Sequence, residues 1–118
     1  KAVAIFKLNT LWALTAVSAA LAIFLSEITS NTATASMLVP IVIGIADKAG
    51  IPPLIPALAT TLASSFGNCL PVSTPPNALV YATGKVPIPY MTRKGIGFDL
   101  AGLAILLGVL YCLRRFFA

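Results

Sequence analysis

The chain has 118 residues, of which 58% are hydrophobic and only 9% are charged, whereas about a quarter of the residues in a soluble domain are charged. This composition predicts an all-α integral membrane protein, and the net charge of +5 gives no support for nucleic-acid binding, because basic residues of membrane proteins gather in loops and flanks. The lack of histidine and of a CxxC pair excludes imidazole catalysis and leaves a thiolate metal site without support.

The first polar interruption, at Ser30, Asn31 and Thr32, separates two apolar stretches of unequal length. Residues 8–26 would be about 28 Å long as a helix, whereas residues 35–46 would reach only about 18 Å. A full membrane span needs about 20 residues. Because the interruption has little charge and no glycine, we expect a re-entrant helical hairpin over residues 8–46, with two ordinary spans and an external loop as the alternative.

Residues 52–84 are expected to form a helix that breaks inside the membrane. Pro52 and Pro53 suit its first turn, and the apolar run over residues 54–66 would be only about 20 Å long before Gly67, a residue typical of helix ends. Backbone that leaves a helix at membrane depth needs protein or a polar cavity around it, because the bilayer core offers no water for its hydrogen bonds. Breaks of this kind are typical of transporter sites.

The broken helix is expected to begin again just after Thr74. This residue precedes a proline and is therefore biased toward extended backbone, which suits an N-cap whose hydroxyl accepts the N–H of Asn77. Pro75 fits the first helical position, and the short half-helix should end near Ala82.

A polar loop over residues 83–94 is expected to precede the last transmembrane helix, residues 95–115. Arg114 and Arg115 mark its end, because their long side chains can reach the membrane surface. Asp99 is expected near the start of this helix, either at the interface or as a partner of the positive helix end. Small residues recur on one side of the helix and predict close helix packing there: Gly97, Ala101, Ala104 and Gly108.

A second polar interruption runs from Ser73 to Asn77. Together, the two polar interruptions can bind an anion and a cation. Ser30 can cap the helix that follows it and leave backbone N–H groups free at the positive end of that helix, where they suit an anion. The helix that ends near Gly67 directs carbonyl oxygens toward the same space, where a small cation such as Na⁺ finds hard oxygen ligands. Glu27 is expected to accept backbone N–H groups of the hairpin tip rather than to bind a ligand.

Two segments carry a resemblance to a known family. FLSEITSNTATA over residues 24–35, followed by LPVSTPPNA over residues 70–78, resembles the C-terminal part of the divalent anion/sodium symporters. The resemblance implies half of an inverted-repeat transporter, with residues 1–118 forming the C-terminal part of the transport domain of a larger protein. It also implies an elevator-type movement and a homodimer that assembles through parts outside this chain.

The resemblance further implies roles for individual residues. Those expected to contact a substrate carboxylate are Ser30, Asn31, Thr32, Thr74 and Pro75. Those expected to bind Na⁺, largely through backbone carbonyls, are Ser26, Thr29, Asn31 and Ser73. Ser26 and Ser73 stand where the family more often has threonine and alanine, and both keep a small side chain and a carbonyl.

The sequence therefore favours a secondary active transporter of small di- and tricarboxylates such as succinate, malate, fumarate or citrate, coupled to Na⁺ and without an organic cofactor. The alternatives within transport are a carboxylate exchanger and a carrier of another divalent anion such as sulfate. A membrane-embedded hydrolase is less favoured, because a Ser or Thr nucleophile needs an activating base and only Glu27 is available. A purely structural membrane subunit would not require two polar interruptions. We expect no enzymatic activity and a location in the inner (plasma) membrane of a bacterium.

Overall fold

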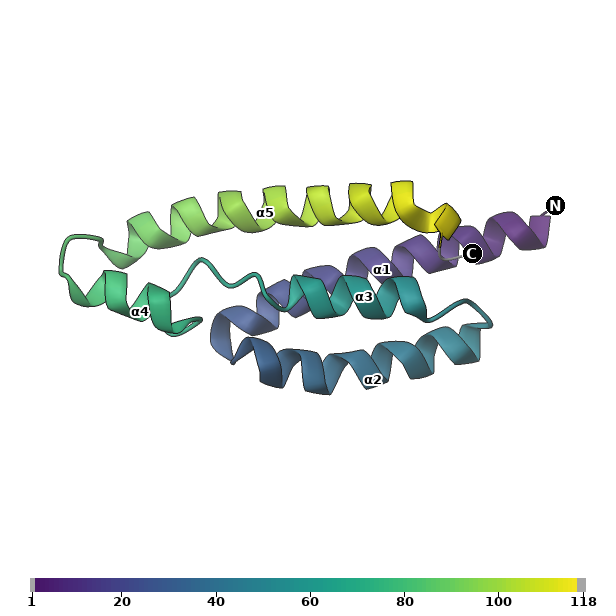
Figure 1. The fold of residues 1–118 in the computed structure, drawn as a ribbon, viewed down its shortest axis with the longest axis horizontal. Helices are drawn as coiled ribbons and strands as arrows, with labels where there is room; N and C mark the ends of the chain where they lie inside the picture. Colours follow the sequence, from purple (N-terminus) through teal and green to yellow (C-terminus); the bar gives the residue numbers. More distant parts are fainter. Residues whose placement is uncertain (1, 117–118) are drawn as a thin grey trace.

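The computed structural model describes residues 2–116, and all the regular secondary structure in that part is helical (Figure 1). The elements are α1 (Ala2–Ile28), α2 (Asn31–Ala49), α3 (Leu54–Ala63), α4 (Pro75–Ala82), α5 (Ile88–Leu113) and a final 3-10 turn, η1 (Arg114–Phe116). In the described part of the chain, three segments are long and apolar enough to cross a membrane: Asn9–Ile28, Asn31–Ala49 and Ile88–Leu113. The expected all-α membrane architecture is confirmed at this level.

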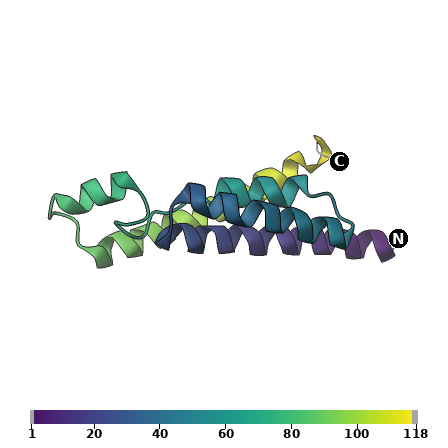
Figure 2. The same ribbon diagram turned by 90° about the horizontal axis from the view of Figure 1, so that it is seen from below.

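The first two helices, α1 and α2, pack side by side and antiparallel around a turn at Thr29 and Ser30 (Figures 1 and 2). As expected, Ser30 caps α2 in an extended conformation, and its hydroxyl accepts the N–H of Ala33 at 3.1 Å. Because the helix already starts at Asn31, it has 19 residues and is about 28 Å long. The expectation of a short second arm over residues 35–46 is therefore wrong, and the polar residues form the first helical turn.

Between α3 and α4 lies an irregular segment, residues 64–74, and the two helices follow one another along the long axis of the molecule (Figure 1). The regular part of α3 ends at Ala63, before the expected Phe66, because the N–H of Phe66 bonds to the carbonyl of Ala63 at 3.0 Å and tightens the last turn. The chain re-enters a helix at Pro75 with Thr74 as the N-cap residue, as expected. The break thus lies where the sequence predicts it.

The last long helix, α5, begins at Ile88, so the expected polar loop over residues 83–94 is wrong in its second half. Pro87 is the extended N-cap residue, and a further proline in the first turn needs no acceptor for an N–H. The longer helix places Asp99 about three turns from the helix start, and its side chain is only 5% exposed. The expectation of an interfacial Asp99 is therefore wrong.

The expected small-residue face of α5 makes no close packing contact within residues 9–116, so this expectation is wrong for that part of the chain. Its members are exposed, and its glycines have open space around them: Gly97, Ala101, Ala104 and Gly108. The glycines that permit close approach are two others. A Cβ added to Gly95 would lie 2.3 Å from the carbonyl oxygen of Asn68, and one added to Gly102 would lie 3.0 Å from the ring of Phe66.

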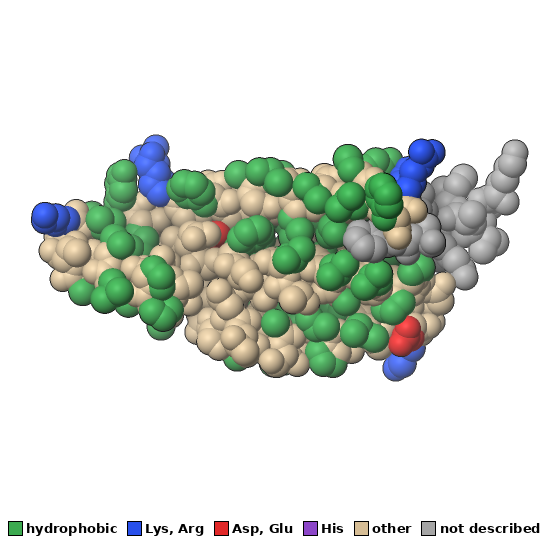
Figure 3. All heavy atoms as spheres, viewed as in Figure 1, with side chains coloured by type: hydrophobic (Ala, Val, Ile, Leu, Met, Phe, Trp, Pro, Cys, Tyr) green, Lys and Arg blue, Asp and Glu red, His purple; other side chains and the backbone are tan. Residues whose placement is uncertain are grey.

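The interior is formed where α1, α2 and α3 meet, and much of it is made of small residues that let helix backbones approach closely: Ala19, Ala22, Ala46, Ala59 and Ala63. Two fully buried hydroxyls are satisfied within their own helices, since Thr15 and Thr60 each donate at 2.7 Å to the carbonyl four residues earlier. Figure 3 shows apolar side chains over much of one face and Lys and Arg side chains near its two ends. This surface suits contact with lipid along the length of the molecule.

Candidate functional site

The irregular segment between α3 and α4 lies against the end of α1. The hydroxyl of Ser26 is hydrogen-bonded to the carbonyl of Phe66. The hydroxyl of Ser73 lies 2.9 Å from the carbonyl of Glu27 and 2.6 Å from its carboxylate. Two residues of the predicted cation site, Ser26 and Ser73, thus connect the C-terminal end of α1 to the irregular segment between α3 and α4.

Gly67 lies where these contacts converge. A Cβ added to it would lie 3.3 Å from the carbonyl oxygen of Ser26, 3.4 Å from the Cβ of Ser73 and 3.5 Å from Oδ1 of Asn31. Three of the four residues predicted to bind Na⁺ are therefore neighbours around one glycine. The sequence indicates only a helix end at Gly67, and the space that it leaves for these neighbours is visible only in three dimensions.

Only one of the two polar atoms of the Asn31 side-chain amide has a hydrogen-bond partner among the described residues. Its Nδ2 lies 3.5 Å from the carbonyl oxygen of Ser65, to which it donates, while its Oδ1 is buried and has no hydrogen-bond partner among the described residues. Leaving a buried acceptor without a partner costs about 1–3 kcal/mol, so this oxygen is suited to a ligand. Together with the nearby carbonyl of Ser26, it offers the kind of hard oxygen donors that coordinate Na⁺ at broken helices.

Thr29, the fourth residue predicted to bind the cation, uses its hydroxyl elsewhere. That hydroxyl lies 2.9 Å from the carbonyl oxygen of Leu25 and 2.7 Å from the hydroxyl of Thr34. The atoms that surround Gly67 belong to the other three residues and not to Thr29.

At the start of α4, the hydroxyl of Thr74 accepts the N–H of Asn77 at 3.3 Å, as the sequence predicts. Pro75 follows as the first helical residue and is exposed. The side chain of Asn77 braces the break, since its Nδ2 donates to the carbonyls of Gly67 at 2.8 Å and of Leu70 at 3.0 Å. The sequence predicts that carbonyls near Gly67 point toward a cation. The carbonyl of Gly67 itself, however, already accepts a hydrogen bond from the Asn77 amide.

The predicted substrate residues lie at the starts of two different helices. At the start of α2, the hydroxyl of Ser30 is occupied as a cap, whereas Thr32 is exposed. The first N–H groups of this helix, those of Asn31 and Thr32, have no acceptor within the helix and stand at its positive end. Within residues 9–116, no hydrogen bond joins this turn to Thr74 or Pro75.

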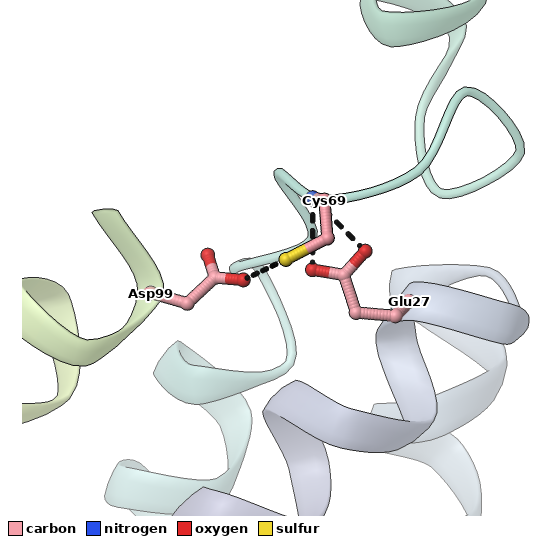
Figure 4. Close-up of side chains that lie close together, drawn as sticks. All are labelled: Glu27, Cys69 and Asp99. Carbon is pink, nitrogen blue, oxygen red and sulfur yellow. Dashed lines mark hydrogen bonds between the residues drawn. The ribbon is translucent and has the colours of Figure 1, made fainter. Parts of the chain in front are cut away.

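Figure 4 shows a buried cluster that the sequence does not predict, in which α1 and α5 hold the irregular segment between them. Glu27 of α1 accepts the N–H of Cys69 at 3.1 Å, so the expectation that it serves the hairpin tip is wrong. Asp99 of α5 accepts from Nδ2 of Asn68 at 2.7 Å and from the thiol of Cys69 at 3.3 Å. An acidic residue inside an apolar stretch is the sequence signal that marks both carboxylates.

Comparison with known proteins supports the family that the two sequence motifs resemble. The sequence model of the family described as "Sodium:sulfate symporter transmembrane region" matches residues 5–115. The chain is 40% identical over 91 residues to the "Sodium-dependent dicarboxylate transporter SdcS" of Staphylococcus saprophyticus, and 44% identical over 98 residues to the "Sodium-dependent high-affinity dicarboxylate transporter 3" of Caenorhabditis elegans. It is also 41% identical over 98 residues to an "Uncharacterized transporter" of Haemophilus influenzae.

These three matches cover 77%, 81% and 81% of the chain but only 18%, 17% and 21% of the relatives, so the chain spans about a fifth of their length. All three relatives are named as transporters and none as an enzyme. The family match extends over nearly the whole chain and includes both polar interruptions. The chain therefore belongs to the family of divalent anion/sodium symporters.

Proposed function

We propose that this chain forms part of a Na⁺-coupled secondary transporter of small di- and tricarboxylates, of the succinate, malate, fumarate or citrate type. The observation that carries the proposal is the buried, unpartnered Oδ1 of Asn31, which lies with the carbonyl of Ser26 beside Gly67. The names of the relatives, sodium-dependent dicarboxylate transporters, support this ion and this class of substrate.

In this proposal, Na⁺ is held by carbonyl and amide oxygens, and no charged side chain contacts it directly. The residues that would hold it are Ser26, Thr29, Asn31 and Ser73. Oδ1 of Asn31 needs a partner, and the other oxygen ligands carry no formal charge. A small monovalent cation therefore suits the position better than a second hydrogen-bond donor.

The substrate carboxylates would be bound at the two helix starts. At the start of α2, a carboxylate would meet free N–H groups and roughly half a positive charge from the helix, with contacts from Ser30, Asn31 and Thr32. At the start of α4 the two prolines supply no N–H, so the hydroxyl of Thr74 and the surface of Pro75 would serve instead. Asn31 belongs to both sites, so the binding of the cation and of the anion should strengthen each other.

We also propose that α1 and α2 form a re-entrant hairpin whose tip at residues 29–32 faces the substrate. Thr32 is exposed at this tip and suits a labelling test. In the longer protein that contains this sequence, called the parent transporter below, a Thr32→Cys variant should react with a membrane-impermeant thiol reagent more slowly when succinate is bound. Fast labelling that succinate does not change would support an ordinary external loop.

We further propose that this chain lies in a domain that moves by an elevator-type mechanism in a homodimer. The dimer is tested by the mass of the purified parent transporter in detergent, where a monomeric mass would contradict it. The movement is tested by labelling the same Thr32→Cys variant from each side of the membrane. An elevator predicts access from alternating sides, and access that stays on one side would contradict it.

The proposed function is tested by uptake of labelled succinate into vesicles that contain the parent transporter. We expect uptake that requires an inward Na⁺ gradient and that unlabelled malate and fumarate inhibit. Uptake that needs no Na⁺ but requires carboxylate inside the vesicles would indicate an exchanger. The family description makes sulfate a second candidate substrate, and sulfate uptake without succinate uptake would favour it.

The hydroxyl of Thr74 provides a first prediction. Thr74→Val keeps the shape of the side chain but removes both the helix cap and the donor, whereas Thr74→Ser keeps both. A hydrogen bond to a charged group is worth about 1.5–3 kcal/mol, so the valine variant should bind succinate roughly 10- to 150-fold more weakly, at about 1.4 kcal/mol per decade. Titration of succinate in Na⁺ measures this. If the valine and serine variants bind alike, the hydroxyl makes no substrate contact.

A further inference from the structure

The start of α4 is held to the irregular segment by the side chain of Asn77. Figures 1 and 2 show α4 at one end of the molecule, past the ends of α1, α2 and α3. None of the residues of α4 is buried by the described part of the chain. Apart from the helix cap at Thr74, the hydrogen bonds that join α4 to the segment before it, within residues 9–116, run from Asn77 to the carbonyls of Gly67 and Leu70. The position of this helix start therefore depends on one amide.

Asn77 takes part in two sets of hydrogen bonds at once. Its side chain lies 2.8 Å from the carbonyl oxygen of Gly67 and 3.0 Å from that of Leu70, and the amide nitrogen must face them because carbonyl oxygens only accept. Its backbone N–H donates to the hydroxyl of Thr74 at 3.3 Å. One residue thus contacts both Gly67, around which the proposed cation ligands gather, and Thr74, a proposed substrate contact.

We propose that Asn77 is a positioning residue that couples the cation site beside Gly67 to the carboxylate contact at the start of α4. This inference rests on the proposed function, because it links two sites that the proposed function assigns. It adds a residue that belongs to neither set of predicted ligands and that transmits the effect of one ligand to the other.

The coupling follows the contacts from the cation to the substrate. A cation held by Oδ1 of Asn31 and the carbonyl of Ser26 would fix the position of Gly67, which lies beside both oxygens. The carbonyl of Gly67 then holds the amide of Asn77, and the N–H of Asn77 holds the hydroxyl of Thr74. A carboxylate at Thr74 would act on Gly67 in the reverse direction, because coupling between two sites is reciprocal.

The expected size of the effect follows from the hydrogen bonds that carry it. A hydrogen bond between neutral groups is worth roughly 2- to 12-fold in an equilibrium constant. Asn31 belongs to both proposed sites and couples the two ligands directly at the start of α2. Loss of the Asn77 amide should therefore reduce the coupling without abolishing it.

The test measures the Kd of the purified parent transporter and of its variants for succinate, in KCl and in NaCl at equal ionic strength. The Kd in KCl divided by the Kd in NaCl is the coupling ratio. Asn77→Ala removes the amide but keeps the backbone N–H that donates to Thr74. We expect affinity to fall more in NaCl than in KCl, so that the ratio drops by roughly 2- to 12-fold. A purely structural role would weaken binding equally in both salts and leave the ratio unchanged.

Asn68→Ala is the matched control. The amide of Asn68 also braces the irregular segment, but it donates to Asp99 of α5 at 2.7 Å and bonds neither to Gly67 nor to α4. The ratio of this variant should equal that of the parent transporter. Two further variants test the amide itself: Asn77→Gln keeps it and should recover part of the ratio, whereas Asn77→Leu keeps the approximate shape without a donor and should not.

A parental ratio in Asn77→Ala and Asn77→Leu, or an equal fall in Asn77→Ala and Asn68→Ala, would overturn the coupling role. Na⁺-dependent succinate binding in the parent transporter together with either result would contradict this inference alone. Equal succinate affinity in the two salts in the parent transporter itself would contradict the proposed function, and the coupling with it.

Discussion

Asn31→Ala in the parent transporter should sharply reduce succinate uptake at low Na⁺ concentrations while the protein still inserts into the membrane. The substitution removes the buried, unpartnered Oδ1 that lies with the carbonyl of Ser26 beside Gly67. It leaves the helix cap in place, because Ser30 provides that cap. A lost contact to a charged ligand is worth about 1.5–3 kcal/mol, so the Na⁺ concentration for half-maximal uptake should rise by at least roughly tenfold.

The matched control is Ser36→Ala, which removes the polar group of an exposed residue of the same helix. Its uptake should equal that of the unchanged transporter, because surface substitutions away from special features change stability by no more than about 0.5 kcal/mol. Uptake measured over a range of Na⁺ concentrations separates the two variants. An Asn31→Ala transporter that retains the parental Na⁺ dependence would place the cation elsewhere.

Gly95→Ala should distort the irregular segment that carries the candidate site, although Gly95 itself lies outside that site. The added Cβ would lie 2.3 Å from the carbonyl oxygen of Asn68 and 2.6 Å from the Cα of Cys69, so two backbones would have to separate. Overpacking usually costs about 1–3 kcal/mol, and a clash with backbone belongs at the upper end because no side-chain rotation relieves it. The movement would also pull Cys69 away from Glu27 and Asp99.

Gly97→Ala is the control for this variant, because a Cβ at Gly97 meets no atom within 4 Å and alanine is the better helix former. Thermal unfolding of the purified variants should show a lowered midpoint for Gly95→Ala and an unchanged or slightly raised midpoint for Gly97→Ala. Equal midpoints for the two variants would mean that α5 does not pack against the irregular segment as described.

The parts of the structure that the sequence predicts correctly depend on neighbouring residues. Ser30 and Thr74 each cap a helix that begins with the next residue, and Pro75 takes the first helical position. Each of these features follows from the hydrogen-bonding and φ preferences of a few adjacent residues. The order and spacing of the two motifs likewise identify the family and lead to the neighbours of Gly67.

The parts that the sequence misses depend on contacts between distant residues or on competing local signals. The hydrogen bonds of Cys69 to Glu27 and Asp99 join residues 42 and 30 positions apart, and no local pattern reports such a pairing. α5 begins before its charged residues because a proline start outweighs polar composition, and this shift turns an expected interfacial Asp99 into a buried one. The length of α2 is missed for a similar reason, since apolar runs underestimate a helix whose first turn is polar.

The most direct test of Na⁺-coupled dicarboxylate binding is the Kd of the purified parent transporter for succinate, measured in NaCl and in KCl at equal ionic strength. We predict that Na⁺ tightens succinate binding by roughly 5- to 150-fold and that succinate tightens Na⁺ binding by the same factor, because a coupling free energy between two sites is reciprocal. The Asn31→Ala variant should lose this mutual effect. Equal succinate affinity in the two salts, with Na⁺ binding indifferent to succinate, would contradict the proposal that the oxygens around Gly67 hold the coupling ion.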